Sequence, residues 1–140
     1  MTEDVQYRKD GAVASIRFNR PGKKNAITVA MYAALASALD DAANDSTVRV
    51  AGIFGGSDFT AGNDLRDFIA AGSFSEDMPV LQFLRALSAF PKPLVAGVKG
   101  VAIGIGTTLL MHCDAVVAGR GARFSMPFTK LGLAPEAGVT

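Results

Sequence analysis

Apolar and polar residues alternate over short stretches near the start of the chain, which is the pattern of half-buried β-strands. In the stretch 13–19, Ile16 and Phe18 fall on one face of an extended segment. The stretch 5–9 precedes it across Asp10-Gly11, a dipeptide that favours a tight hairpin turn. We therefore expect the chain to begin with a pair of antiparallel strands.

After this hairpin, the spacing of the apolar residues changes to that of a helix. Thr28 is a suitable N-cap for a helix that reaches about Asn44, because apolar residues recur at every fourth position from Met31. The stretch 80–90 also has helical spacing, and Pro91 ends it. We expect two amphipathic helices, each with an apolar side available for packing.

Short apolar runs at 48–54, 94–98 and 115–118 predict buried strands. Between the last two runs lie a glycine-rich turn, Gly100–Gly106, and a predicted short helix, Thr107–His112. Strands that alternate with helices are typical of an α/β domain with largely parallel pairing. The length of 140 residues and the apolar content of 49% fit one such domain with a sizeable core.

Charge and composition exclude several function classes. The formal net charge is +1 with no basic block, which argues against a dedicated nucleic-acid binder. No run approaches the roughly 20 apolar residues of a membrane span, and Met1–Asp10 has no signal-peptide core. The single cysteine, Cys113, and the single histidine, His112, are too few for a zinc site. We expect a soluble intracellular protein without a bound metal, and the lone cysteine fits a reducing compartment.

The glycine-rich turn Gly100–Gly106 is the first candidate for chemistry. A strand-to-helix turn can offer free backbone N–H groups to an anion or a developing oxyanion. The same glycines can instead serve only tight packing, and the pattern weighs the two readings equally. The turn lacks the third glycine of a dinucleotide fingerprint, the Gly-Lys-Ser/Thr of a P-loop and the serine of a hydrolase elbow.

Two further stretches carry candidate residues. In Thr60–Leu65, small residues allow close approach of a ligand, although the spacing alone favours ordinary turn or capping roles for Asn63 and Asp64. In Phe124–Glu136, leucines at 131 and 133 are expected to anchor the segment and to leave Glu136 among apolar neighbours. Such neighbours raise the pKa of a carboxyl group, which suits a general base that works near neutral pH. The pattern alone, however, favours an exposed loop glutamate.

Taken together, these segments resemble the crotonase superfamily, the enoyl-CoA hydratase and isomerase group. The matching stretches keep their order along the chain and are Asn19-Arg20-Pro21, Lys24-Asn25-Ala26, Ala61–Leu65, Lys92-Pro93, Gly100–Gly106, Cys113-Asp114 and Phe124–Glu136. The resemblance implies an α/β fold, a crotonase-like spiral of β-β-α units. Residues 1–140 would be the N-terminal part of a single domain, lacking the C-terminal helical region through which relatives form a homotrimer or a dimer of trimers.

The resemblance also implies a site for an acyl-CoA thioester. The backbone N–H groups of Asn63 and Ile105 would hold the thioester carbonyl oxygen. The groove for the CoA part would be lined by Ala61, Gly62, Asn63, Asp64, Leu65, Ala26 and Lys24, with Lys23 as a further neighbour of the phosphates. Because coenzyme A belongs to the substrate, no separate cofactor is expected.

Carboxylates decide which reaction the resemblance implies. The hydratases use two glutamates, and the corresponding positions in this chain are Thr108 and Phe128. These two uncharged side chains cannot hold and split water. Pro135-Glu136 instead looks like the Δ3,Δ2-enoyl-CoA isomerases, most closely the peroxisomal type, with Glu136 as the single base in fatty acid β-oxidation. The alternatives are a hydratase-like or other crotonase reaction, or a non-catalytic acyl-CoA-binding or assembly homologue. The compartment would be a bacterial cytoplasm or a peroxisome.

Overall fold

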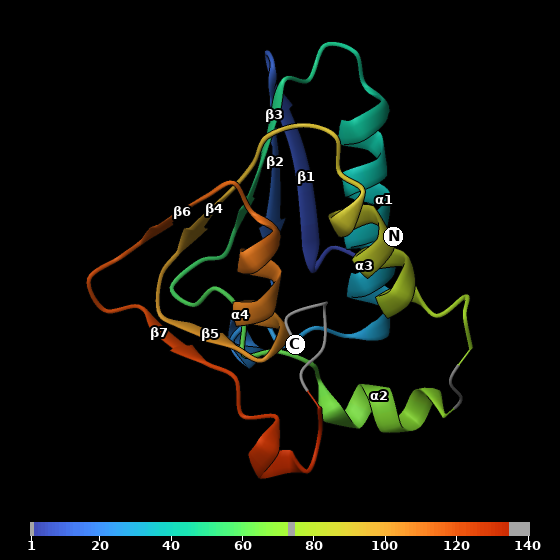
Figure 1. The fold of residues 1–140 in the computed structure, drawn as a ribbon, viewed down its shortest axis with the longest axis vertical. Coiled ribbons are helices and arrows are strands. Elements are labelled where there is room, and N and C mark those ends of the chain that lie inside the picture. The colour runs from blue at the N-terminus through green and yellow to red at the C-terminus, as the bar shows by residue number, and fades with distance from the viewer. Residues whose placement is uncertain (1, 73–74, 135–140) are drawn as a thin grey trace.

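A mixed β-sheet with helices packed on one side forms the body of the computed structural model, which describes residues 2–72 and 75–134 (Figure 1). The elements in chain order are β1 (Val5–Asp10), β2 (Val13–Phe18), α1 (Val29–Asn44), β3 (Val50–Phe54), α2 (Leu65–Ala71), α3 (Pro79–Ser88), β4 (Leu94–Val98), β5 (Val101–Ile103), α4 (Ile105–Thr108), β6 (Ala115–Ala118) and β7 (Arg123–Ser125). Short 3₁₀ turns occupy Pro21–Lys23, Leu109–His112 and Thr129–Leu131.

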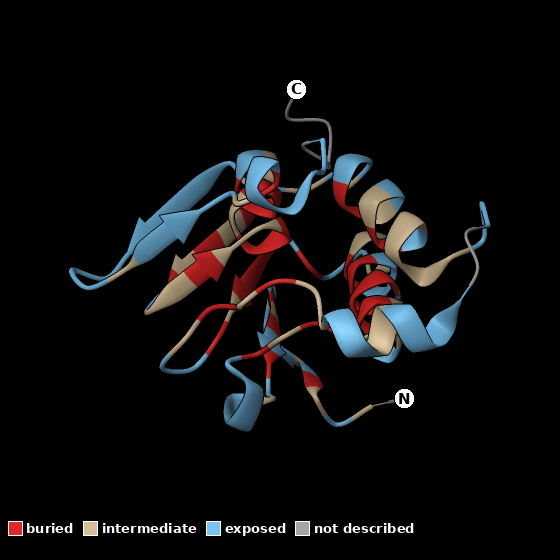
Figure 2. Ribbon diagram, turned by 90° about the horizontal axis from the view of Figure 1, so that it is seen from below, coloured by how far each residue is buried: buried red, intermediate tan, exposed pale blue. Residues whose placement is uncertain are grey.

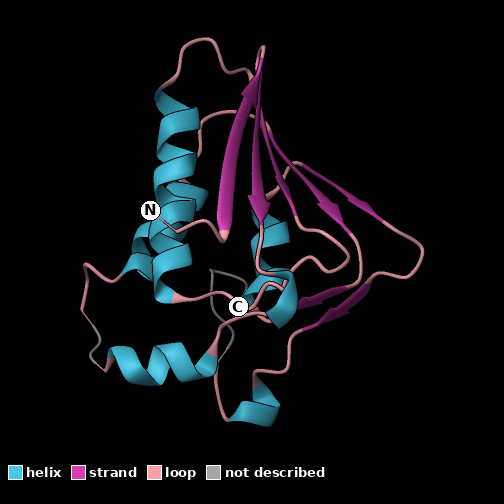
Figure 3. Ribbon diagram, turned by 180° about the vertical axis from the view of Figure 1, so that it is seen from behind, coloured by secondary structure: helices cyan, strands magenta, loops and turns pink. Residues whose placement is uncertain are grey.

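The strands form one large and one small sheet. The large sheet has five strands in the order β1-β2-β3-β4-β6, with β1 and β2 antiparallel and the other neighbours parallel. The small sheet pairs β5 with β7 in parallel, and Figure 3 shows it beyond the lower ends of the large sheet. The predicted α/β class with largely parallel pairing is therefore confirmed.

The hairpin at the start of the chain forms as the alternation predicts. β1 and β2 pair from Val5 opposite Phe18 to Asp10 opposite Val13. Gly11, in the turn, has φ +58°, a conformation that glycine adopts without steric cost. Ile16 and Phe18 are buried, as their shared face requires.

Helix α1 begins and ends where its sequence signals place it. The Thr28 hydroxyl oxygen accepts a hydrogen bond of 3.1 Å from the N–H of Met31, which caps the first turn. The apolar stripe of the helix is buried in a common core with the strands and α3, and Figure 2 shows the buried residues concentrated between these elements. At the other end, the ammonium of Lys92 donates to the carbonyl oxygens of Ala42 at 2.7 Å and Asp45 at 2.6 Å. A cation here satisfies carbonyls that the helix leaves unpaired.

Some predicted features differ from the structure. The run 115–118 is a strand, β6, but an exposed one, with Val117 at 74%. It lies at the end of the five-stranded sheet, so its side chains have a neighbouring strand on one side only among the described residues. The glycine-rich turn contains the short strand β5, and the helix after it starts two residues earlier than predicted, at Ile105. The expectation that Leu131 and Leu133 anchor their segment is wrong, since these side chains are 55% and 56% exposed and Phe128, at 7%, is buried instead.

Two other kinds of feature are absent from the residues that the structure describes. None of their helices is both long enough and apolar enough to cross a membrane. No three His, Cys, Asp or Glu residues among them are grouped as metal ligands.

Replacing Lys92 with Met is expected to destabilise the protein. The Lys92→Met variant keeps most of the apolar stem but leaves the carbonyls at the end of α1 without their charged donor, so the free energy of unfolding should fall by about 1–3 kcal/mol. Urea unfolding followed by circular dichroism measures this change. Lys99→Met, at an exposed lysine, is the matched control, and equal stability of the two variants would contradict the capping role.

Candidate functional site

The segment 60–64 lies between two backbone partners that fix its path. On one side, the N–H of Thr60 donates to the carbonyl of Val101 at 3.1 Å, and the N–H of Ile103 donates to the carbonyl of Thr60 at 3.0 Å. On the other side, Ile27 donates its N–H to the Gly62 carbonyl and accepts the N–H of Asp64, both at 2.8 Å. The segment is thereby joined both to β5 and to the stretch before α1.

This pattern of hydrogen bonds sets the direction of the Asn63 amide. Residues of an extended segment present their N–H and C=O groups to alternate sides. Because Gly62 and Asp64 use theirs toward Ile27, the N–H of Asn63 points to the opposite side. No group of the described residues accepts this N–H, so it is available to a bound molecule.

The start of α4 provides a second available amide. Gly104 precedes the helix with φ +60° and ψ −120°, a conformation that favours glycine, and its carbonyl accepts the N–H groups of Thr107 and Thr108 at 2.9 and 3.0 Å. Ile105 is the first helical residue, where an N–H has no intrahelical acceptor, and within the described part of the chain it has no other. Since α4 spans only Ile105–Thr108, the amide itself matters here more than a helix dipole.

Two glycines allow these loops to touch. A Cβ atom on Gly62 would lie 2.7 Å from the carbonyl oxygen of Ile103. A Cβ atom on Gly106 would lie 2.7 Å from Cγ2 and 2.9 Å from the carbonyl oxygen of Thr60. The packing reading of the glycine-rich turn is therefore confirmed, because this tight packing brings the segments of Asn63 and Ile105 side by side.

A buried asparagine and a buried threonine support the first loop. The side chain of Asn25, 3% exposed, donates to the carbonyls of Asp58 at 2.9 Å and Phe59 at 3.1 Å. The hydroxyl of Thr60 donates to the carbonyl of Asn25 at 2.6 Å and accepts the N–H of Gly62 at 3.0 Å. Neither residue has a role predicted from the sequence. The left-handed backbone of Asn25, φ +57°, is a conformation that asparagine tolerates, so an asparagine after a Pro-Gly turn was an available signal.

Charged groups link the same loop to the N-termini of two helices. Asp64 accepts a hydrogen bond of 2.7 Å from the Arg20 guanidinium and one of 3.1 Å from the N–H of Asp67, which caps α2. Asp67 in turn accepts the N–H of Val29, at the start of α1, at 2.6 Å. The Arg20 guanidinium holds the pKa of the Asp64 carboxyl below its ordinary value, with help from the Asp67 N–H. Both carboxylate oxygens of Asp64 are thus engaged within the protein.

The remaining predicted site residues differ in position and exposure. Lys24 and Ala61 are adjacent, because the N–H of Ala61 donates to the carbonyl of Lys24 at 2.9 Å. Lys24 and Leu65 are exposed, as is Lys23, whereas Ala61 is half-buried. The half-buried Ala26 lies in the same stretch as Lys24. The predicted base, Glu136, lies outside the described residues.

One hollow among the described residues lies away from these loops. It has a volume of about 510 Å³ and is lined by residues of α3 and β4 together with His112 and Asp114. A smaller hollow of about 200 Å³ adjoins the site, and Lys24, Asn25 and Asp58 contribute to its wall. The candidate site is therefore defined here by its two amides, with this smaller hollow beside them.

Comparisons with known proteins agree with this architecture. The family model described as enoyl-CoA hydratase/isomerase matches residues 8–140. Enoyl-CoA delta isomerase 2 of Rattus norvegicus is 42% identical over 97% of this chain and 36% of its own length. The structure of Pseudomonas aeruginosa OdaA superposes with a TM-score of 0.93 and 48% identity, over 98% of this chain and 56% of that one.

A further relative and a further structure extend the comparison. The 2,3-dehydroadipyl-CoA hydratase of Escherichia coli (strain K12) is 39% identical over 100% of this chain and 55% of its own length. An enoyl-CoA hydratase/isomerase structure from Pseudoalteromonas atlantica T6c gives a TM-score of 0.92 at 43% identity, over 96% of this chain and 54% of that one. The chain therefore spans from about a third to just over half of the length of these proteins.

Adding a methyl group at Gly106 is expected to separate the two loops. In Gly106→Ala, the new Cβ would meet Thr60 at less than 3 Å, so the backbone must move, at a cost of about 1–3 kcal/mol. Amide NMR spectra should show large shifts for Asn63 and Ile105. Gly22→Ala is the matched control, because a Cβ atom at Gly22 would meet no other group within 4 Å. Unchanged amide shifts in Gly106→Ala would contradict the close contact.

Removing the charge of Asp64 is expected to lower stability in a pH-dependent way. Because its pKa is depressed in the folded protein, the charged carboxyl stabilises the fold above the unfolded-state pKa of about 4, and this contribution is lost as the pH falls through the folded-state pKa. Asp64→Asn, which keeps an acceptor for the Asp67 N–H, should therefore melt below the wild type at pH 7, with a gap that narrows in acid. Thermal unfolding across this pH range measures the gap. A gap independent of pH would contradict the charge pairing, and Asp10→Asn, at an exposed residue, is the control.

Proposed function

Because the chain belongs to the enoyl-CoA hydratase/isomerase family, we propose that it is a Δ3,Δ2-enoyl-CoA isomerase, which moves the double bond of a 3-enoyl-CoA to the 2-position. The two available amides of Asn63 and Ile105, on loops in direct contact, support an acyl thioester as the ligand. The observation that carries isomerisation is the burial of two uncharged residues, Thr108 and Phe128, at the hydratase positions. The similarity to an enoyl-CoA delta isomerase at 42% identity supports the same assignment.

The two amides provide the electrostatic part of the reaction. Loss of a proton from C2 places negative charge on the thioester oxygen, and two preorganised N–H donors stabilise that charge as it develops. The segment of Asn63 is held by β5 and Ile27, and Ile105 starts a helix packed on Thr60. Because the donors are fixed before the substrate binds, little reorganisation is needed during the reaction.

A single carboxylate completes the proposed mechanism. The Glu136 carboxylate takes the proton from C2, and the electron pair of the C–H bond forms a dienolate whose oxygen lies between the two amides. The resulting carboxylic acid returns its proton to C4, and the double bond is then between C2 and C3. No water is consumed and no oxidant is needed, so one base is sufficient.

The residues at the two hydratase positions support isomerisation over hydration. Thr108 is fully buried, and its hydroxyl lies 3.5 Å from the carbonyl oxygen of Ile105. Phe128 is 7% exposed and has no group that can accept a proton. Hydration requires an acid and a base that hold water, which these two side chains do not provide.

Hydration is the second candidate function, because a hydratase is among the relatives at 39% identity. A 1,2-epoxyphenylacetyl-CoA isomerase of Escherichia coli (strain K12), 37% identical over 100% of this chain, likewise keeps another one-base reaction open. A non-catalytic acyl-CoA-binding homologue would retain the amides and lack turnover. All three readings share the acyl-CoA ligand and differ in what happens to it.

The binding of the CoA part is assigned to the surface beside the amides. Lys23 and Lys24 are exposed there, and their ammonium groups provide point charges for phosphates. Ala61–Leu65, together with Ala26, would form the wall along the pantetheine arm. Coenzyme A enters as part of the substrate, and we propose a homotrimer or a dimer of trimers as the working assembly.

Replacing Glu136 with Gln tests the proposed base. Glu136→Gln keeps the size of the side chain but cannot accept the C2 proton, so the conversion of a 3-enoyl-CoA should slow by about 10²–10⁴-fold, while acyl-CoA affinity measured by calorimetry stays close to wild type. Glu3→Gln, at an exposed glutamate, is the matched control and should keep full activity. Near-normal turnover in Glu136→Gln would contradict the assignment.

The wild-type reaction separates the candidate functions. With a 3-enoyl-CoA substrate, formation of the conjugated 2-enoyl product is expected and can be followed by its absorbance. With a 2-enoyl-CoA substrate, no hydration is expected. Hydration at a useful rate would favour the second candidate, and binding without either reaction would favour the non-catalytic homologue.

A further inference from the structure

A tyrosine outside the predicted site contacts one of its two key residues. Tyr32 lies in the first turns of α1, and its hydroxyl donates a hydrogen bond to Oδ1 of Asn63. Resting on the proposed function, we infer that Tyr32 is a positioning residue for the isomerisation, because it holds Asn63 so that its backbone N–H faces the thioester oxygen.

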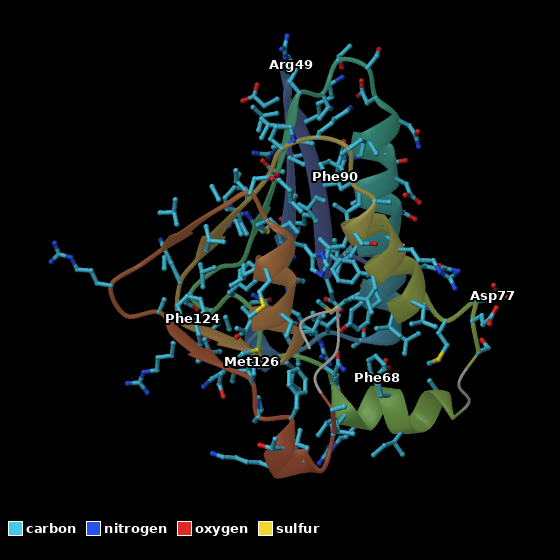
Figure 4. All side chains as sticks on the ribbon, viewed as in Figure 1. Arg49, Phe68, Asp77, Phe90, Phe124 and Met126 are labelled. Atoms are coloured by element: carbon cyan, nitrogen blue, oxygen red, sulfur yellow. The ribbon has the colours of Figure 1, made fainter. Side chains whose placement is uncertain are left out.

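The ring of Tyr32 is itself held firmly. Tyr32 is fully buried. Its ring packs edge-on against Phe68 of α2, with 5.8 Å between ring centroids, and in a tilted arrangement against Phe83 of α3 at 5.4 Å. Figure 4 shows Phe68 on the side of α2 that faces the other helices. A ring enclosed by three helices has little freedom to move, so its hydroxyl is a fixed point for Asn63.

The side chain of Asn63 adds a restraint that its backbone neighbours do not provide. Gly62, which precedes it with φ +88°, has no side chain of its own to anchor the turn. Hydrogen bonds through Ile27 restrain the neighbours of Asn63, and none of the described residues restrains the Asn63 N–H itself. The Tyr32 bond restrains the side chain of the same residue, and productive sites require donors held within about 0.5 Å and 10–20°.

The loss of this hydroxyl should affect the transition state more than substrate binding. In Tyr32→Phe, the ring packing is kept and the bond to Asn63 is removed. We expect kcat to fall about tenfold, the size of one neutral hydrogen bond, with KM within about twofold of wild type because the CoA contacts are unchanged. Tyr7→Phe is the matched control, since Tyr7 lies on β1 and is the other tyrosine of the chain.

A double-mutant cycle distinguishes positioning from general stability. Asn63→Ala keeps the backbone N–H but removes the acceptor of the Tyr32 hydroxyl. If Tyr32 acts through Asn63, adding Tyr32→Phe to Asn63→Ala should lower kcat by less than about twofold, because the bond is already absent. The same tenfold loss in both backgrounds would overturn the inference, and so would an unchanged kcat in Tyr32→Phe.

A spectroscopic probe tests the inference independently of turnover. The absorbance of 2,4-hexadienoyl-CoA moves to longer wavelength when hydrogen bonds polarise its carbonyl group. We expect a red shift on binding to the wild-type protein and a smaller shift in Tyr32→Phe. Equal shifts in the two proteins would overturn the role of Tyr32 alone. Absence of any binding or shift with the wild type would overturn the proposed function and this inference with it.

Discussion

The direct contact between the segment 60–64 and the turn before α4 is the constraint on which the candidate site depends. Its closeness is set by the missing side chains of Gly62 and Gly106, since a Cβ at either position would come within 3 Å of backbone oxygen in the facing loop. Thr60 adds two backbone hydrogen bonds to β5 across the same contact. Two amides on different elements could serve one oxygen only if their loops approach this closely, so the proposed function depends on this packing.

Polar side chains stabilise this contact by linking the segment 60–64 to the stretch before α1 and to α2. Asn25 holds the chain before Thr60 through its buried amide, and Asp64 is tied to Arg20 and to the first turn of α2. Asp67 then caps α1. A shift in the site loop would therefore disturb the N-termini of both helices at once, and this shared dependence favours one arrangement of the backbone.

The sequence predicts those features whose signals are local. The Asp10-Gly11 hairpin and the Thr28 cap depend on residues a few positions apart, and both form as expected. The exposure of β6, the strand inside the glycine-rich turn and the burial of Phe128 instead of Leu131 depend on which distant segments meet. The same reason explains the missed role of Asn25, whose side-chain acceptors lie 33 and 34 residues away. Asn63 and Ile105 were identified only through the resemblance, because backbone amides leave no residue-type signal.

The proposed site would separate charge stabilisation from proton transfer, and this separation would limit the reactions that suit it. The amides of Asn63 and Ile105 can stabilise an enolate formed from any acyl thioester, so they do not select a reaction. Selection would fall to the side chains that face the carbon atoms of the substrate. Thr108 and Phe128, at the positions of the two hydratase glutamates, are buried and carry no charge, so neither could supply the acid or the base that hydration requires. Under the proposed function, a single base takes the proton from C2 and returns it at C4, and that transfer is isomerisation.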